Sequence, residues 1–106
     1  MQLRNFKVGP GPVIEFGDHV TVHYQSTSLH GRLIENSEVN FPAGVNFIAG
    51  SDAVPPVLSE GVIGMRVGGR REIVAPPSAH FPDQLRGQIL MYDINVVGGR
   101  KKSEMI

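Results

Sequence analysis

Residues 54–65 (VPPVLSEGVIGM) constrain the fold most, because they form the one segment with helical periodicity in a chain of short strands and turns. Val54, Leu58, Val62 and Met65 recur at the spacing of an α-helix, so one side of the segment is apolar and must be buried. Two prolines are tolerated in a first helical turn, whose backbone donors lack partners. A single helix of this length is not stable alone. The surrounding strands are therefore expected to wrap it.

Alternating patterns and turn residues dominate the rest of the chain. Residues 19–26 alternate most clearly, with Val20, Val22 and Tyr24 on one face. The 13 glycines and 8 prolines supply the turns of a small β-rich fold. Further short strands are expected at residues 1–8, 13–16, 32–37, 45–49, 70–75 and 89–97, with loops at 38–44 and 78–87. The sequence thus predicts an α+β domain, an antiparallel β-sheet of about five strands wrapped around one short α-helix.

One domain is expected, because 106 residues suffice for a single modest core. It should occupy residues 1–97, and residues 98–106 are expected to form a polar C-terminal tail with little to pack. The absence of cysteine excludes disulfides, thiolate metal sites and a cysteine nucleophile. No apolar run approaches a membrane span, and the N-terminus lacks the pattern of a signal peptide. We therefore expect a cytoplasmic, monomeric domain with no membrane partner.

Charge and histidine content argue against nucleic-acid and metal binding. Ten basic and ten acidic residues give a formal net charge of zero, although Arg66, Arg70 and Arg71 could make a local basic patch. His19 and His23 share one face of a predicted strand, but they lie far apart for one metal ion and no third ligand is evident nearby. Neither nucleic acid nor a metal ion is expected as a partner.

Several stretches, in the right order, resemble the FKBP family of macrolide-binding peptidyl-prolyl isomerases. The motifs that carry the resemblance are residues 17–24 (GDHVTVHY), Gly31 with residues 34–37 (IENS), residues 60–62 (EGV) with 64–71 (GMRVGGRR), and residues 92–94 (YDI). Together they extend from about Phe6 to Val97. The resemblance implies the family's fold, prolyl isomerase activity, proline-containing peptides or proteins as substrates, and no cofactor.

Such an activity needs no acid, base or nucleophile. Rotation of an X-Pro bond must overcome a barrier of about 18–20 kcal/mol that amide resonance sets. A catalyst can hold the proline in an apolar pocket that prefers the twisted amide, so aromatic and aliphatic walls are the machinery.

The resemblance also implies which residues form the substrate pocket. Tyr24, Phe81 and Tyr92 would be the catalytic residues. The full substrate-binding set would be Tyr24, Ile34, Glu35, Val45, Val54, Pro55, Leu58, Phe81, Leu85 and Tyr92.

This chain departs from the family pattern at several pocket positions. Leu58 stands where the family typically has a tryptophan, and Ile34 and Val45 replace phenylalanines, so the pocket has fewer aromatic walls. Tyr92 replaces a phenylalanine and adds a hydroxyl that needs a partner.

Two further departures remove hydrogen bonds to a ligand. Pro55 has no backbone N–H where the family offers one, and Phe81 replaces a tyrosine. The loop after Phe81 is also shorter than the usual one. Macrolide binding is therefore doubtful. Two functions remain open, a weak prolyl isomerase and a catalytically degenerate interaction or chaperone module on the same scaffold.

Overall fold

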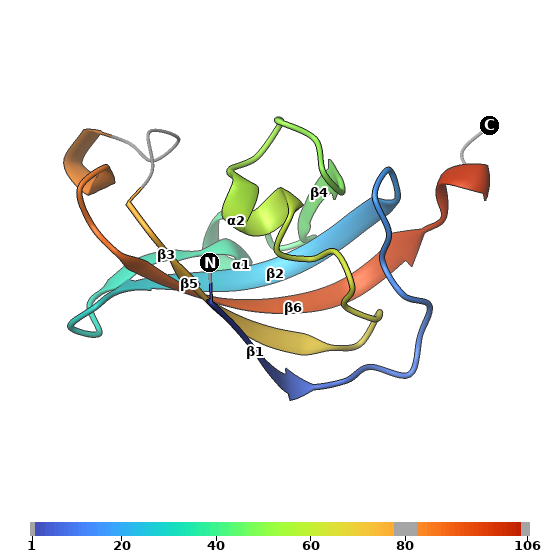
Figure 1. Ribbon diagram of the computed structural model, residues 1–106, viewed down its shortest axis with the longest axis horizontal. Coiled ribbons are helices and arrows are strands. Elements are labelled where there is room, and N and C mark those ends of the chain that lie inside the picture. The colour runs from blue at the N-terminus through green and yellow to red at the C-terminus, as the bar shows by residue number, and fades with distance from the viewer. Residues whose placement is uncertain (1, 78–82, 105–106) are drawn as a thin grey trace.

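The computed structural model describes residues 2–77 and 83–104, which form an antiparallel sheet with two short helices on one of its faces (Figure 1). The strands are β1 (Gln2–Lys7), β2 (His19–Ser28), β3 (Leu33–Asn36), β4 (Val45–Ile48), β5 (Arg70–Ala75) and β6 (Leu90–Arg100). Their order is β1-β5-β6-β2-β3, and β4 pairs with the first part of β2. The helices are α1 (Ser37–Asn40) and α2 (Pro56–Ser59), with 3-10 turns at Asp83–Leu85 and Lys102–Glu104. The predicted α+β architecture is confirmed, with six strands rather than about five.

The two longest strands, β2 and β6, form the centre of the sheet. Their register places Ser26 opposite Tyr92 and Tyr24 opposite Ile94. The predicted inward face of β2 is confirmed, since Val20, Val22 and Tyr24 are all buried. Burying one such aliphatic side chain contributes about 1.5–3 kcal/mol relative to leaving it exposed. This sheet face and the segment around α2 therefore form the core.

Helix α2 is shorter than the sequence predicts, because glycines interrupt residues 54–65. The helix itself spans Pro56–Ser59, and turns follow it. A Cβ on Gly61 would lie 2.1 Å from the Val57 carbonyl oxygen and 2.3 Å from Ile73 Cδ1, so the backbone needs glycine there to approach β5. Gly64 has a φ of 89°, a left-handed conformation that ends helical propagation. The apolar side of the segment is nevertheless wrapped by the sheet, as predicted.

Two other segments differ from their predicted structure. Residues 13–16 form no strand, and Val13 makes only an isolated bridge to Arg66. The loop predicted at 38–44 begins inside helix α1, which was not predicted. Its first turn is stabilised by the Asn36 side chain, whose Oδ1 accepts a hydrogen bond from the Glu38 N–H at 3.0 Å.

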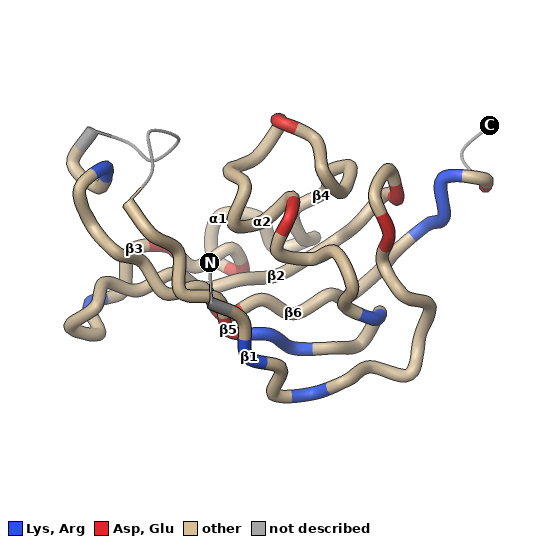
Figure 2. Tube along the Cα trace, in the orientation of Figure 1, with Lys and Arg blue, Asp and Glu red and all other residues tan. Residues whose placement is uncertain are grey.

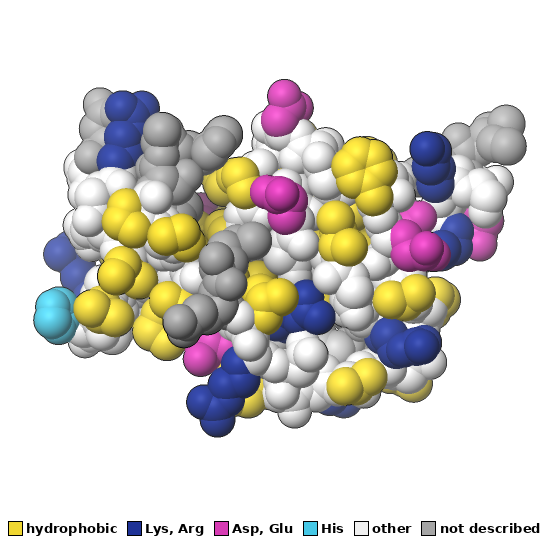
Figure 3. Space-filling view, viewed as in Figure 1, with side chains coloured by type: hydrophobic (Ala, Val, Ile, Leu, Met, Phe, Trp, Pro, Cys, Tyr) yellow, Lys and Arg dark blue, Asp and Glu magenta, His cyan; other side chains and the backbone are white. Residues whose placement is uncertain are grey.

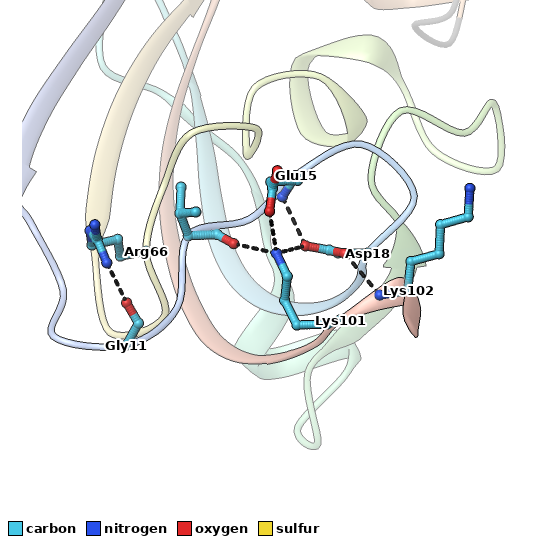
Figure 4. A network of polar contacts seen from close by, with 7 residues as sticks. Gly11, Glu15, Asp18, Arg66, Lys101 and Lys102 are labelled. Carbon is cyan, nitrogen blue, oxygen red and sulfur yellow. Dashed lines mark hydrogen bonds and ion pairs between the residues drawn. The ribbon is translucent and has the colours of Figure 1, made fainter. Parts of the chain in front are cut away.

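Residues 98–104 are attached to the fold, although most of their side chains are exposed, as expected of a polar segment with little to pack. Strand β6 continues to Arg100, past the predicted boundary at Val97. Lys101 Nζ then donates to Glu15 Oε1 at 2.8 Å and to Asp18 Oδ2 at 2.6 Å (Figure 4). We call Glu15, Asp18, Lys101 and Lys102 the tail clasp. A sequence pattern could not reveal it, because its two sides are more than 80 residues apart.

Asp18 is the centre of the tail clasp and is only 2% exposed. Its Oδ1 accepts the Lys102 N–H at 2.9 Å, and its Oδ2 accepts the Glu15 N–H at 2.9 Å in addition to Lys101 Nζ. Burial alone raises the pKa of Asp18, but these hydrogen bonds outweigh burial and hold the pKa below its usual range. The clasp therefore contains a carboxylate whose two oxygens are both satisfied.

Charged side chains of both signs are distributed along the chain (Figure 2). The three arginines of the predicted basic patch are each engaged. Arg71 is buried and donates to the carbonyl oxygens of Gly61 and Ile63, Arg70 pairs with Asp93, and Arg66 Nη1 donates to the Gly11 carbonyl. None of the helices in residues 2–77 and 83–104 has the length and apolar character needed to cross a membrane.

Candidate functional site

A cavity of about 420 Å³ opens between the helices and one end of the central strands. Its walls come from six segments of the chain that the fold brings together. The lining residues are Tyr24 and Ser26 from β2, Ile34 and Glu35 from β3, Asn40 from α1, Pro55 and Leu58 from the α2 segment, Leu85 from the 3-10 turn, and Leu90 and Tyr92 from β6. The lining combines apolar walls with a few polar groups, as small-molecule and peptide sites generally do.

The alternation of the strands explains which side chains face the cavity. Ser26 lies opposite Tyr92 on one side and opposite Glu35 on the other, so these three residues form one row across β6, β2 and β3. Tyr24 precedes Ser26 by two residues and points to the same face. Its ring lies 5.7 Å from that of Tyr92, at an interplanar angle of 31°. The two tyrosines thus form an aromatic wall, with the small Ser26 beside it.

Tyr24 and Glu35 form a short polar contact at the cavity. The Tyr24 hydroxyl donates to Glu35 Oε1 at 2.5 Å. Burial, and then the carboxylate of Glu35, raise the pKa of Tyr24 far above its usual range. Tyr24 is therefore neutral at every physiological pH, and its proton is committed to Glu35.

Tyr92 carries a second hydroxyl at the cavity. Burial, followed by the charge of Glu35, raises the pKa of Tyr92 to about 12. Ser26 lies opposite Tyr92 in the β2–β6 ladder and its hydroxyl opposes this rise, yet Ser26 Oγ reaches no partner at hydrogen-bonding geometry in the described chain. A hydrogen bond weakens steeply outside its distance and angle limits, so Ser26 and Tyr92 are neighbours without a hydrogen bond between their hydroxyls. The cavity wall therefore contains a buried hydroxyl with unused hydrogen-bonding capacity.

Most of the predicted pocket residues meet at this cavity. Those that line it are Tyr24, Ile34, Glu35, Pro55, Leu58, Leu85 and Tyr92. Val45 and Val54 do not line the cavity; both are half-buried and pack against the core beside it. Phe81 lies outside the described residues.

Three lining residues were not among the predicted ones. Strand alternation could have identified Ser26, two residues after Tyr24, and Leu90, two residues before Tyr92. Asn40 carried no such signal, because its position depends on the unpredicted helix α1. The rim at Pro55 offers no backbone N–H, as expected.

A second hollow, of about 280 Å³, lies on the opposite face of the sheet. Its lining is mostly polar and includes His23, Gln25, Arg70, Asp93 and Asn95. His23 Nδ1 lies 2.9 Å from Ser37 Oγ, which gives this histidine a structural contact. A proline ring is apolar and gains little in such a hollow. The apolar cavity is therefore the better candidate for substrate.

No metal centre is formed by the described side chains. Within residues 2–77 and 83–104, no three His, Cys, Asp or Glu side chains are grouped as ligands of one ion. The chemistry available at the cavity is thus shape, apolar contact and neutral hydroxyls beside one carboxylate.

Hydrophobic side chains also gather on the surface near the β2–β3 hairpin, at the end of the molecule that holds the cavity (Figure 3). Leu29, Leu33 and Ile89 are among the exposed hydrophobic residues of this end. Leu33 pairs with Thr27 in the ladder and so points away from the cavity, whereas its neighbour Ile34 lines it. The two faces of β3 can therefore be altered separately.

A family model described as FKBP-type peptidyl-prolyl cis-trans isomerase matches residues 5–97. The chain is 32% identical over 93 residues to the chloroplastic peptidyl-prolyl cis-trans isomerase FKBP19 of Arabidopsis thaliana, covering 78% of this chain and 36% of that protein. It is 39% identical over 86 residues to the 46 kDa FK506-binding nuclear protein of Spodoptera frugiperda, covering 76% of this chain and 19% of that protein. The chain therefore spans a minor part of the length of these relatives.

Two solved structures share the fold. The crystal structure of FkpA from Escherichia coli matches with a TM-score of 0.78 and 24% identity, covering 94% of this chain and 48% of that one. AtFKBP13 matches with a TM-score of 0.74 and 22% identity, covering 91% of this chain and 90% of that one. With the family match over residues 5–97, the chain belongs to the FKBP-type peptidyl-prolyl cis-trans isomerase family.

Proposed function

We propose that this domain is a peptidyl-prolyl cis-trans isomerase whose substrate proline binds in the 420 Å³ cavity. The observation that carries the proposal is the cavity itself, which has aromatic and aliphatic walls at the positions expected from the family. Catalysis needs no covalent step. The barrier of about 18–20 kcal/mol comes from amide resonance, and a pocket that binds the twisted amide more tightly than the planar one lowers it.

In this mechanism the proline ring contacts Leu58 and Ile34, and Tyr24 and Tyr92 form the aromatic wall beside it. Glu35 holds the Tyr24 hydroxyl through the 2.5 Å hydrogen bond and so fixes the orientation of that ring. Val45 and Val54 pack against the core and do not line the cavity, so their predicted contact with substrate stays a prediction. The catalytic role expected for Phe81 stays a prediction.

Macrolide binding is proposed to be weak. Leu58 is smaller than the ring that usually forms the pocket floor, so less apolar area is buried by a ligand. Pro55 cannot donate a backbone hydrogen bond at the rim. Each missing hydrogen bond costs about 0.5–1.5 kcal/mol of affinity.

The test is exchange NMR on X-Pro peptides with Leu, Phe or Ala before proline, at increasing domain concentration. We expect acceleration over the uncatalysed rate. Ile34→Asp, which introduces a charge into the apolar cavity, should reduce the acceleration by about tenfold or more. The matched control is Leu33→Asp on the other face of β3, which should leave the rate unchanged.

No acceleration by the folded wild-type domain would contradict the proposal and favour the interaction-module alternative. Equal rates for the Ile34 and Leu33 variants would place catalysis elsewhere. A chaperone role, a monomeric state and a cytoplasmic location stay predictions. They would be tested by aggregation assays, sedimentation equilibrium and cell fractionation.

A further inference from the structure

Ser26 is the most unusual polar residue of the cavity. Its side chain is 1% exposed, and its Oγ has no hydrogen-bond partner within the described chain. Buried polar groups are nearly always paired, and each exception needs a physical reason. The other two buried serines of this region are paired, since Ser37 Oγ accepts the Tyr24 N–H at 2.7 Å and Ser28 Oγ accepts the Arg32 N–H at 3.1 Å. Among the described residues, Ser51 Oγ is the other buried hydroxyl without a partner, and Ser51 does not line the cavity.

The position of Ser26 gives its hydroxyl access to a bound proline. Ser26 lies in the row between Tyr92 and Glu35, and Tyr24 precedes it by two residues on the same face, so the small side chain leaves a notch beside two large rings. Solvent does not reach Oγ in the free protein. A serine side chain moves between staggered rotamers at low cost, and such a rotation redirects the hydroxyl into the cavity that Ser26 lines.

Two other positions at the cavity do not supply a free donor. The Tyr24 hydroxyl donates to Glu35, and Pro55 has no N–H. In a planar amide the nitrogen lone pair is delocalised into the carbonyl and accepts no hydrogen bond. When the bond twists, this lone pair localises on nitrogen and becomes an acceptor. A donor that meets it stabilises the transition state without stabilising the bound ground state.

We propose that Ser26 is a catalytic residue whose hydroxyl donates a hydrogen bond to the prolyl nitrogen of the substrate in the twisted state. The inference rests on the proposed isomerase function. No covalent bond is broken and no proton is transferred. The hydroxyl is unpaired in the free protein and forms a hydrogen bond only while the X-Pro bond rotates. The free protein tolerates an unpaired buried group, and the transition state pairs it.

The experiment compares Ser26→Ala with the wild-type domain by exchange NMR at saturating peptide, together with the Kd of the same peptide. We expect the exchange rate at saturation to fall about 3- to 10-fold while Kd stays unchanged. Ser26→Thr keeps a hydroxyl and should recover at least half of the loss on a logarithmic scale. Ser28→Ala, two residues along the same strand face, is the matched control and should leave both quantities unchanged.

Thermal unfolding gives a second measurement, in which the two variants should differ in the opposite direction from the exchange rate. Removing an unpaired buried hydroxyl should leave the Tm of Ser26→Ala equal or higher, whereas Ser28→Ala, which loses a paired hydroxyl, should have a lower Tm. A slower enzyme that is not less stable is the result expected for a catalytic group. If Ser26 were purely structural, Ser26→Ala would lower the exchange rate and the Tm together, and that result would overturn the proposal.

The acceptor atom is identified with a thioxo-proline peptide, in which sulfur replaces the carbonyl oxygen before proline. A donor to nitrogen predicts the same wild-type to Ser26→Ala rate ratio for oxo and thioxo peptides. If this rate ratio falls to one for the thioxo peptide, or if Ser26→Ala changes Kd without changing the rate, the Ser26 hydroxyl binds the carbonyl group and the proposal is overturned. If the wild-type domain accelerates nothing, the isomerase function itself fails; if it does but Ser26→Ala is equally fast, only this inference fails.

Discussion

A buried polar group lies at each end of the central strands, and the two groups differ in their hydrogen bonding. At the tail clasp, the buried Asp18 carboxylate receives hydrogen bonds on both oxygens from three donors. At the cavity end, the buried Ser26 hydroxyl has no partner among the described residues. The same strand, β2, begins beside Asp18 and carries Ser26 near its other end. One end is thus built for stability, and the other retains unused capacity for a ligand.

This difference matches the general trade-off between stability and function. A satisfied polar network stabilises and orients the segments that it joins. A site that must bind another molecule keeps unpaired groups and open apolar surface, which lower stability until the ligand is present. Substitutions at the two ends should therefore affect different quantities, and the following predictions test that separation.

The largest effect is expected from Asp18→Ala. The substitution removes three hydrogen bonds to a charged acceptor and leaves Lys101 without its buried partner. We expect the free energy of unfolding to fall by about 2–4 kcal/mol, measured by urea denaturation at pH 7. Isomerisation by the folded fraction should be unchanged. Glu15→Gln, on the exposed side of the clasp, is the control with a smaller loss.

Acid should weaken the tail clasp selectively. Because the folded pKa of Asp18 lies below its usual value, its contribution is complete above the unfolded pKa of about 3.9 and is lost as the pH falls through the folded pKa. Unfolding free energies measured from pH 6 to pH 2.5 should therefore decrease more in the wild-type domain than in Asp18→Asn. Parallel curves for the two proteins would mean that another carboxylate is responsible.

Leu58→Trp should enlarge the apolar floor of the cavity. The added ring offers more apolar area to a ligand, and we expect FK506 to bind about tenfold more tightly than to the wild-type domain. Titration calorimetry or fluorescence of the new tryptophan measures the change. Leu33→Trp, on the opposite face of β3, controls for a nonspecific aromatic contact and should not alter affinity. Equal affinities of both variants would show that the floor does not limit binding.

Tyr24→Phe should lower catalysis with little loss of stability. It removes the hydroxyl that Glu35 holds at 2.5 Å while keeping the ring, so the aromatic wall loses its fixed orientation. We expect kcat/KM to fall about 2- to 10-fold. Glu35→Gln keeps an acceptor and should lose less. A drop in the urea midpoint larger than the drop in rate would make Tyr24 a stability residue and weaken the contrast between the two ends.

The smallest effect is expected on the solvent face of the sheet. Arg70 contacts both carboxylate oxygens of Asp93, but the two side chains are 48% and 32% exposed to solvent. Exposed ion pairs contribute little, because water and salt screen them. Arg70→Met should therefore change neither the urea midpoint nor the exchange rate beyond experimental error. A measurable change in either would mean that charge placement on this face matters as much as burial.

The sequence predicted what depends on short-range patterns. Alternation identified β2 and its inward face, and the motif order identified the family and most of the cavity lining. The length of α2 was overestimated, because the requirement for glycine at Gly61 comes from the close approach of Ile73, which is distant in sequence. The clasp and the unpaired state of Ser26 depend on contacts between β2, β6 and the chain ends, and no local pattern encodes such contacts.

The position of β6 has a consequence for how the chain acquires its structure. This strand follows all the others in sequence but lies between β5 and β2, where it makes both of their central pairings. The sheet therefore closes only after residues 90–100 have left the ribosome, and β2 and β5 present open edges until then. Contacts of such long sequence separation are formed slowly, on the order of milliseconds to seconds for β-rich domains. During synthesis the nascent chain is thus exposed to strand exchange with its neighbours until β6 is available to pair.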